Sequence, residues 1–120
     1  MVALLGATAV GLGAYAAHGM ASWAEQSTIA TVNTAVRYQM WHTLALMGAL
    51  VWQQLAPRLP LCPVIALWLG GTAAFSGSLY ALALGGLSVG LVTPLGGLLL
   101  IAGWLALGVT AWRSGRCRQA

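Results

Sequence analysis

Hydrophobic residues occupy four long runs along the chain, separated by short stretches that contain polar residues, proline or glycine. The runs cover residues of about 2–20, 36–55, 61–84 and 91–112. About 20 residues of helix are needed to cross the hydrocarbon of a bilayer, which is about 30 Å thick. Strands of a membrane barrel alternate apolar and polar residues, and these runs do not. The pattern predicts an all-α membrane protein whose single domain, residues 1–120, holds four transmembrane helices.

Local signals support these boundaries. A proline-rich stretch, 57–63, separates the second run from the third, and Thr93–Pro94 is typical of the start of a helix. The pair Gly85–Gly86 is typical of a helix end. Residues Ser22–Glu25 have the spacing of a capping box, which predicts a short helix in the first loop. That helix would either lie along the membrane surface or continue into the second run.

The composition excludes a soluble protein and most enzymes. Of the 120 residues, 60% are hydrophobic and 5% are charged, whereas a soluble domain has about 25% charged residues. Glu25 is the sole carboxylate side chain, so catalysis by paired carboxylates is excluded, and without lysine a phosphate-binding loop of the Walker type is excluded too. We therefore expect no enzyme, no catalytic residue and no bound cofactor.

The arginines predict the orientation. Four crossings would place Glu25 and Arg37 on one side of the membrane, and on the other side the remaining arginines, Arg58, Arg113, Arg116 and Arg118. Positive residues stay in the cytoplasm, so both termini are expected there, and the net charge of +4 reflects orientation rather than binding to nucleic acid. Because no basic residue precedes the first run, we do not expect a cleaved signal peptide. Cys62 and Cys117 would both face the reducing side, where a disulfide is not expected.

Small residues recur at helical spacing in every run. Ala9, Gly13 and Ala17 are four residues apart in the first run, and Gly70 and Ala74 have the same spacing in the third. Helices in lipid associate where small residues allow their backbones to approach closely. We therefore predict a compact four-helix bundle. Because so small a bundle leaves much surface free, we also predict a homo-oligomer or a subunit of a membrane complex, with membrane lipids as neighbours.

Polar side chains gather in the half of the runs that would face away from the cytoplasm. The candidates are His18, Arg37, Tyr38, Gln39, His42, Ser76, Ser78, Tyr80 and Thr93. Polar residues within a membrane are functional candidates. Three interpretations are open: hydrogen bonds between helices, a pocket for an amphiphile such as a quinone or a lipid headgroup, and a haem or metal held by His18 and His42. At i, i+4 spacing, Tyr38 shares a helix face with His42. Arg37 and Trp41 have the same spacing, which allows a cation–π contact.

Four sequence strings, taken together, resemble one family. They are Gly13–Gly19, Tyr38–Ala45, Phe75–Tyr80 and Thr93–Gly97. In this order they are similar to a domain-of-unknown-function family of small inner-membrane proteins of the YgdD type, with transmembrane protein 256 as a eukaryotic relative. The resemblance implies a multi-pass protein with four spans in the bacterial inner membrane, and it implies no reaction, ligand or catalytic residue.

We therefore predict a non-catalytic structural or accessory component that self-associates or docks into a larger membrane complex. The alternative is a binding protein for an amphiphile, a quinone or a lipid, or for haem, in the polar cluster named above. A further alternative is an oligomeric pore, although the runs offer no ring of charge that would set its selectivity.

Overall fold

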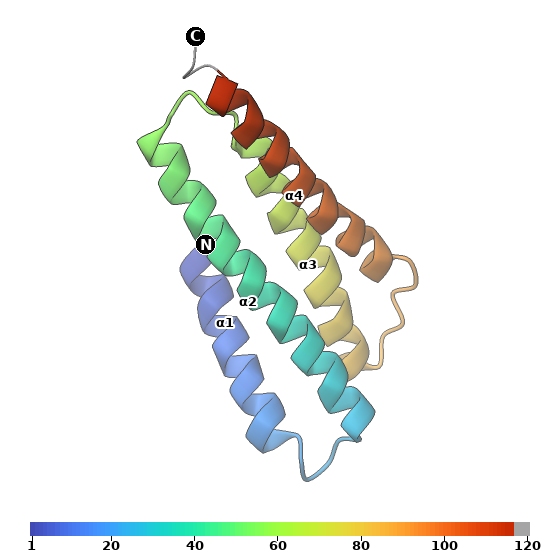
Figure 1. Cartoon of the computed structure of the whole chain (residues 1–120). Coiled ribbons are helices and arrows are strands. Elements are labelled where there is room, and N and C mark those ends of the chain that lie inside the picture. Colours follow the sequence, from blue (N-terminus) through green and yellow to red (C-terminus); the bar gives the residue numbers. More distant parts are fainter. Residues whose placement is uncertain (117–120) are drawn as a thin grey trace.

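Four long helices make up the computed structural model, which describes residues 1–116 and their side chains as far as residue 114 (Figure 1). Short loops connect them. In chain order the helices are α1 (Val2–Ala14), which continues as a π-helix (Tyr15–Gly19), α2 (Gln26–Leu55), α3 (Cys62–Gly85) and α4 (Val92–Arg116). Cys117 and Arg118, to which the sequence analysis gave a cytoplasmic position, lie outside the described residues.

Three of the four predicted spans are confirmed as helices long and apolar enough to cross a membrane. Within the described residues they are Val2–Gly19, Cys62–Gly85 and Val92–Ser114. α2 is the longest helix but does not reach the same hydropathy, because it carries polar side chains in its middle. Several of these, including Gln39 and His42, are buried against other helices rather than exposed to lipid.

α2 begins about ten residues earlier than the predicted second span. It runs without a break from Gln26, so the helix expected in the first loop is the first part of α2 and not a separate surface helix. The capping box predicted at Ser22 is wrong, because the backbone still turns there: the amides of Trp23 and Ala24 donate to the carbonyl of Met20. Glu25 is the residue that precedes the helix.

The helices pack as an open row and not as the predicted compact bundle. α1 contacts α2, α2 contacts α3 and α3 contacts α4. In the described part of the chain no other pair of these four helices comes within 8 Å between Cα atoms. The row is visible in Figure 1, and the Cα extents of 61 × 27 × 18 Å agree with a flat, elongated molecule. The prediction of four helices is confirmed, whereas their arrangement is a flat row rather than the predicted compact bundle.

Small residues allow neighbouring helices to pack closely. A Cβ atom on Gly96 of α4 would lie 2.8 Å from the Cα atom of Phe75, and one on Gly71 of α3 would lie 2.6 Å from Leu100. Such distances require glycine, so α3 and α4 approach each other at backbone contact. In α1, Ala9 is buried, whereas Ala17 of the same predicted stripe is exposed.

The ends of the α3–α4 loop agree with the sequence signals. The predicted end of α3 is confirmed, because Gly86 follows the helix with a φ of +64°, a conformation that suits glycine. The amides of Gly86 and Leu87 donate to the carbonyls of Leu82 and Ala81. α4 begins at Val92, one residue before the predicted Thr93.

Two clusters of buried apolar side chains lie along α2. One contains Ala16 and Met20 from the first helical segment together with Val32 of α2. The other comprises Leu46, Ala49, Leu61, Val64, Trp68 and Leu100. The stretch of α2 between Val32 and Leu46 contains Gln39, His42 and Thr43, all of them buried. A polar layer therefore separates the two apolar clusters.

Candidate functional site

Gln39 joins three helices. Its side-chain Nε2 donates to the carbonyl of Leu5 and to Oγ1 of Thr8 in α1, both at 2.8 Å. Its Oε1 accepts a hydrogen bond of 2.8 Å from the hydroxyl of Tyr80 in α3. The side chain is only 5% exposed, and both of its amide hydrogens are used. Gln39 therefore acts as a polar link between α1, α2 and α3.

His42 joins α2 to α4, two helices without a backbone contact in the described chain. Its Nε2 lies 3.2 Å from the indole Nε1 of Trp104, and its Nδ1 lies 2.8 Å from the carbonyl of Tyr38. An indole N–H can only donate, so Nε2 of His42 is the acceptor and Nδ1 carries the proton. Both ring nitrogens of His42 therefore take part in hydrogen bonds.

Aromatic rings surround His42. The ring of Tyr38 lies 4.7 Å from that of Phe75 and 5.4 Å from that of Trp41, between centroids. The rings of Trp68 and Trp104 lie 4.7 Å apart. All of these rings except that of Trp68 border a hollow of about 550 Å³ between α2 and α4, which we call the aromatic groove. Its lining residues are Tyr38, Trp41, His42, Leu44, Phe75, Gly97, Leu100, Ile101 and Trp104.

A second hollow, of about 530 Å³, lies between α1 and α3. We call it the small-residue groove, since Ala73 and Gly77 of α3 line it together with Leu5, Gln39 and Thr72. This groove is bounded by α1 and α3 beside α2, whereas the aromatic groove is bounded by α2 and α4 beside α3. The hydroxyl of Thr72 is buried without a hydrogen-bond partner.

The predicted serines and threonine make shorter links. The hydroxyl of Ser76 donates to the carbonyl of Ala35 at 2.9 Å and so ties α3 to α2. The hydroxyls of Ser78 and Thr93 lie 2.7 Å apart and tie α3 to the start of α4. These three predicted residues therefore take part in contacts between helices.

His18 lies apart from the other candidates. It is exposed on the π-helix, and the structure gives it no hydrogen bond among the described residues. α1 and α2 are antiparallel, with Thr8 opposite Gln39, so His18 and His42 lie on opposite sides of this pair, about 20 Å apart along the helix axis. One iron or metal ion cannot bind both. Groups of three or more metal-ligating side chains are also absent from the part of the chain that is described.

Arg37 is also separate from the hydrogen-bonded layer. Its side chain is exposed, and within residues 1–114 it has no hydrogen bond, ion pair or ring contact. The cation–π contact that the sequence allowed with Trp41 is not formed, since the ring next to Trp41 is that of Tyr38.

Several partners in this layer were missed by the sequence analysis. Thr8 is an ordinary residue of an apolar run, and Trp104 lies in the half of the fourth span away from the predicted polar cluster. The one available signal for Trp104 was its indole N–H, a group that can only donate a hydrogen bond.

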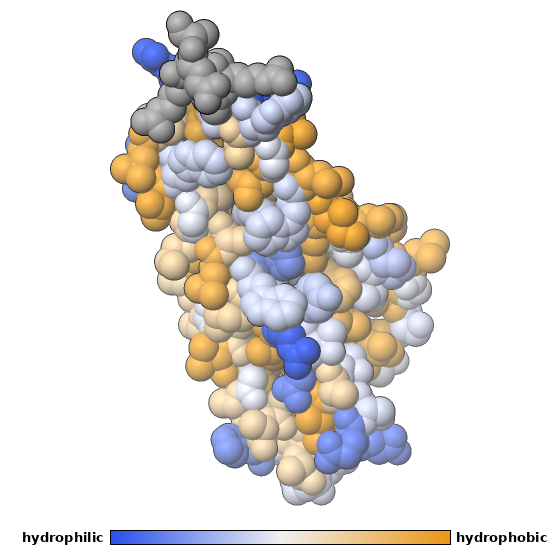
Figure 2. All heavy atoms as spheres, in the orientation of Figure 1, coloured by the Kyte–Doolittle hydropathy of each residue, from blue (hydrophilic) through white to orange (hydrophobic). Residues whose placement is uncertain are grey.

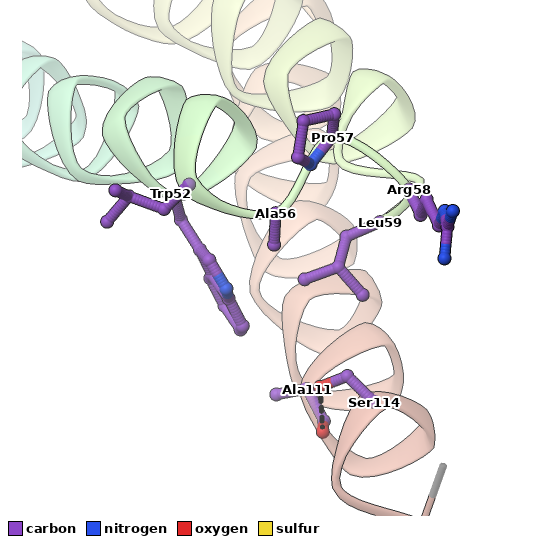
Figure 3. A pocket seen from close by; sticks show the side chains of 8 residues that line it. Trp52, Ala56, Pro57, Arg58, Leu59, Ala111 and Ser114 are labelled. Carbon is purple, nitrogen blue, oxygen red and sulfur yellow. Dashed lines mark hydrogen bonds between the residues drawn. The ribbon is translucent and has the colours of Figure 1, made fainter. Parts of the chain in front are cut away.

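A third hollow lies at the other end of the row, near the α2–α3 loop. It has a volume of about 960 Å³ and is drawn in Figure 3. Trp52 and Leu59 form part of its wall, and the side chain of Arg58 points away from them. The hydroxyl of Ser114 is already bonded to the carbonyl of Ala111 at 2.7 Å. We assign no chemistry to this hollow.

Comparison with known proteins identifies relatives of this chain. A family model described as "Protein of unknown function (DUF423)" matches residues 12–97. A UPF0382 membrane protein of Haemophilus influenzae is 38% identical over 115 residues, covering 95% of this chain and 92% of that protein. The UPF0382 inner membrane protein YgdD of Escherichia coli is 36% identical over 120 residues, with coverages of 92% and 86%. The UPF0382 membrane protein YwdK of Bacillus subtilis is 39% identical over 108 residues, with coverages of 86% and 85%. No solved structure matches.

Proposed function

Because this chain belongs to the DUF423 family, whose relatives are named as membrane or inner membrane proteins, we propose that it is a non-catalytic accessory protein of the bacterial inner membrane. In this proposal it self-associates or docks into a larger membrane complex. The site geometry favours such a role, because the polar side chains of the central layer are used to link helices.

We infer that all four helices cross the membrane, so that α2 is a span in addition to the three long apolar helices. The support is its central place in the row: α2 packs between α1 and α3, both long and apolar enough to span. Its polar residues at the centre are buried against these neighbours, which allows a less apolar helix to cross. The arginine distribution then favours cytoplasmic termini.

The observation that carries the docking proposal is a face of α3 without a partner helix. Ala66, Gly70, Ala73 and Gly77 are all exposed and recur at helical spacing. A Cβ atom on Gly77 would meet open space. Exposed small residues in lipid favour the close approach of another helix.

A cross-linking experiment tests the docking face. A cysteine at Ala73, in a chain whose Cys62 and Cys117 are changed to serine, should cross-link to a second copy or to a co-purifying membrane protein in native membranes. Gly77→Leu, which fills the groove, should reduce this cross-linking severalfold. Gly108→Leu on α4, where a Cβ atom likewise meets open space, is the matched control. A strictly monomeric protein without a co-purifying partner would contradict the proposal.

A second candidate function is the binding of an amphiphile in the aromatic groove. The groove is lined by aromatic and aliphatic side chains and has one polar pair, His42 and Trp104, on its wall. Such a lining suits the chain or ring of a lipid or quinone. Mass spectrometry of small molecules that co-purify with the wild type and with His42→Ala tests this candidate. If the bound molecules and the stability are the same in both, the candidate falls.

A further inference from the structure

Arg37 is a cation without a counterion among the residues that the structure describes. The sequence contains one acidic residue, Glu25, which lies 12 residues earlier and therefore about 18 Å away along α2. Arg37 is exposed and without a hydrogen-bond or ion-pair partner among the described side chains. Within a membrane an unpaired charge of this kind is costly. The counterion is thus expected to come from the surroundings.

The neighbouring contacts place Arg37 at a definite depth. The residues before it, Ala35 and Val36, contact Ser76 of α3 and Gly13 of α1. From these points the first helical segment continues six residues to Gly19, and α3 continues nine residues to Gly85, or about 9 and 14 Å. An arginine side chain at this depth extends toward the polar surface of the leaflet on that side. Arg37 can therefore reach the phosphates of that leaflet.

The aromatic groove begins one helical turn from Arg37. Arg37, Trp41 and Leu44 lie at i, i+4 and i+7 and are all exposed, so they share one face of α2. Trp41 and Leu44 line the groove, and Phe75 lies on its floor. Figure 2 shows a strip of pale and blue residues that follows α2, with orange surface on both sides. A charged group and an apolar groove are thus adjacent along one face.

We propose that Arg37 and the aromatic groove together bind one anionic phospholipid of the leaflet on their side of the membrane. The guanidinium of Arg37 pairs with the lipid phosphate, to which its planar donors are suited. One acyl chain lies between α2 and α4 against Trp41 and Phe75. A zwitterionic phospholipid fits the groove equally well but carries its own positive group, so Arg37 favours the anionic lipid. The proposal rests on the second candidate function above and specifies its ligand.

Native mass spectrometry of the full chain tests the proposal with two probes, phosphatidylglycerol and phosphatidylcholine with identical acyl chains. We expect the first phosphatidylglycerol to bind about five-fold more tightly, the ratio that corresponds to about 1 kcal/mol for one arginine at a membrane surface. In Arg37→Gln this preference should fall to about one. Arg113→Gln removes an exposed arginine from the far end of α4 and should keep the preference.

A groove-filling variant, Ile101→Trp, distinguishes the contribution of the acyl chain to binding from that of the lipid headgroup. It should weaken the binding of both lipids severalfold while Arg37 is intact. If Arg37→Gln keeps the preference, or if Arg113→Gln loses it equally, the pairing with Arg37 is wrong. If Ile101→Trp lowers binding but the wild-type protein prefers neither lipid, the groove binds an amphiphile and the proposal of an anionic ligand is wrong. If Ile101→Trp has no effect on either lipid, both fall.

Discussion

Gln39 lies where α1, α2 and α3 are held together by side-chain hydrogen bonds. Three bonds of 2.8 Å start or end at its amide, and two of them reach a helix that α3 does not contact. In lipid, apolar burial adds little between helices, so such bonds and close packing decide which faces meet. A hydrogen bond between membrane helices contributes about 0.6 kcal/mol on average.

Replacing Gln39 by leucine tests this role. We expect the free energy of unfolding in detergent to fall by about 2 kcal/mol, because three hydrogen bonds are lost and the buried hydroxyl of Tyr80 loses its acceptor. Thermal or denaturant unfolding measures the change. Gln54→Leu, at an exposed position near the end of α2, is the matched control and should change stability little. Equal effects of the two substitutions would contradict the role of Gln39 as a link.

The sequence identified the polar residues of this site, but it did not identify the residues to which they are hydrogen-bonded. Gln39, His42 and Tyr80 stand out because they are polar residues within apolar runs. Thr8 and Trp104 do not stand out, and their roles depend on which helix faces meet. His18 shares the histidine chemistry of His42 but lies on the other side of Gln39, and only the antiparallel register of α1 and α2 reveals this separation. Residue types thus predicted which side chains are candidates for the site, whereas their hydrogen-bond partners depend on how the helices pack.

At the scale of the elements, glycines set how closely α3 and α4 approach. Gly71 and Gly96 lie at the crossing where an added Cβ atom would meet another side chain or the backbone itself. Gly103 faces Trp68 in the same way, which lets that large ring be buried. The pair of helices is therefore held by its backbones more than by interdigitated large side chains.

Gly96→Ala should separate α3 and α4. Because the backbone of Phe75 cannot move aside as a flexible side chain does, we expect a loss of stability of about 1–3 kcal/mol, the usual cost of overpacking. Gly108→Ala, on the same helix but with open space around it, should be neutral or slightly stabilising, since alanine favours helix. Unfolding of both variants in the same detergent checks the difference. A Gly96→Ala variant as stable as Gly108→Ala would contradict the close crossing.

The apolar runs predicted the helices, but they did not predict how the helices pack. The start of α2 was left open by the sequence because Ile29, Val32 and Val36 suit either a surface helix or a continuous one. The open row was not predicted, since small residues occur on more than one face of each helix. On α3, Gly71 meets α4 whereas Gly77 meets open space, although both are small and helical.

At the scale of the whole molecule, the orientation in the membrane is a prediction from the arginines. A fluorescent protein fused to the C-terminus should fluoresce, and alkaline phosphatase at the same place should be inactive, because both report a cytoplasmic end. Alkaline phosphatase inserted after Gly90, between α3 and α4, should be active. An active phosphatase at the C-terminus would show that the four-span arrangement with cytoplasmic termini is wrong.

The single-file packing of the helices also has a consequence for how the chain assembles. Apart from the His42–Trp104 hydrogen bond, each helix packs only against the helices next to it in the sequence, so α1 and α2 can pair while α3 is still being synthesised, and α4 adds last. Contacts close in sequence form quickly because little chain entropy is lost in bringing them together. Biogenesis can thus proceed hairpin by hairpin in the order of translation, and no early helix has to wait for the final one.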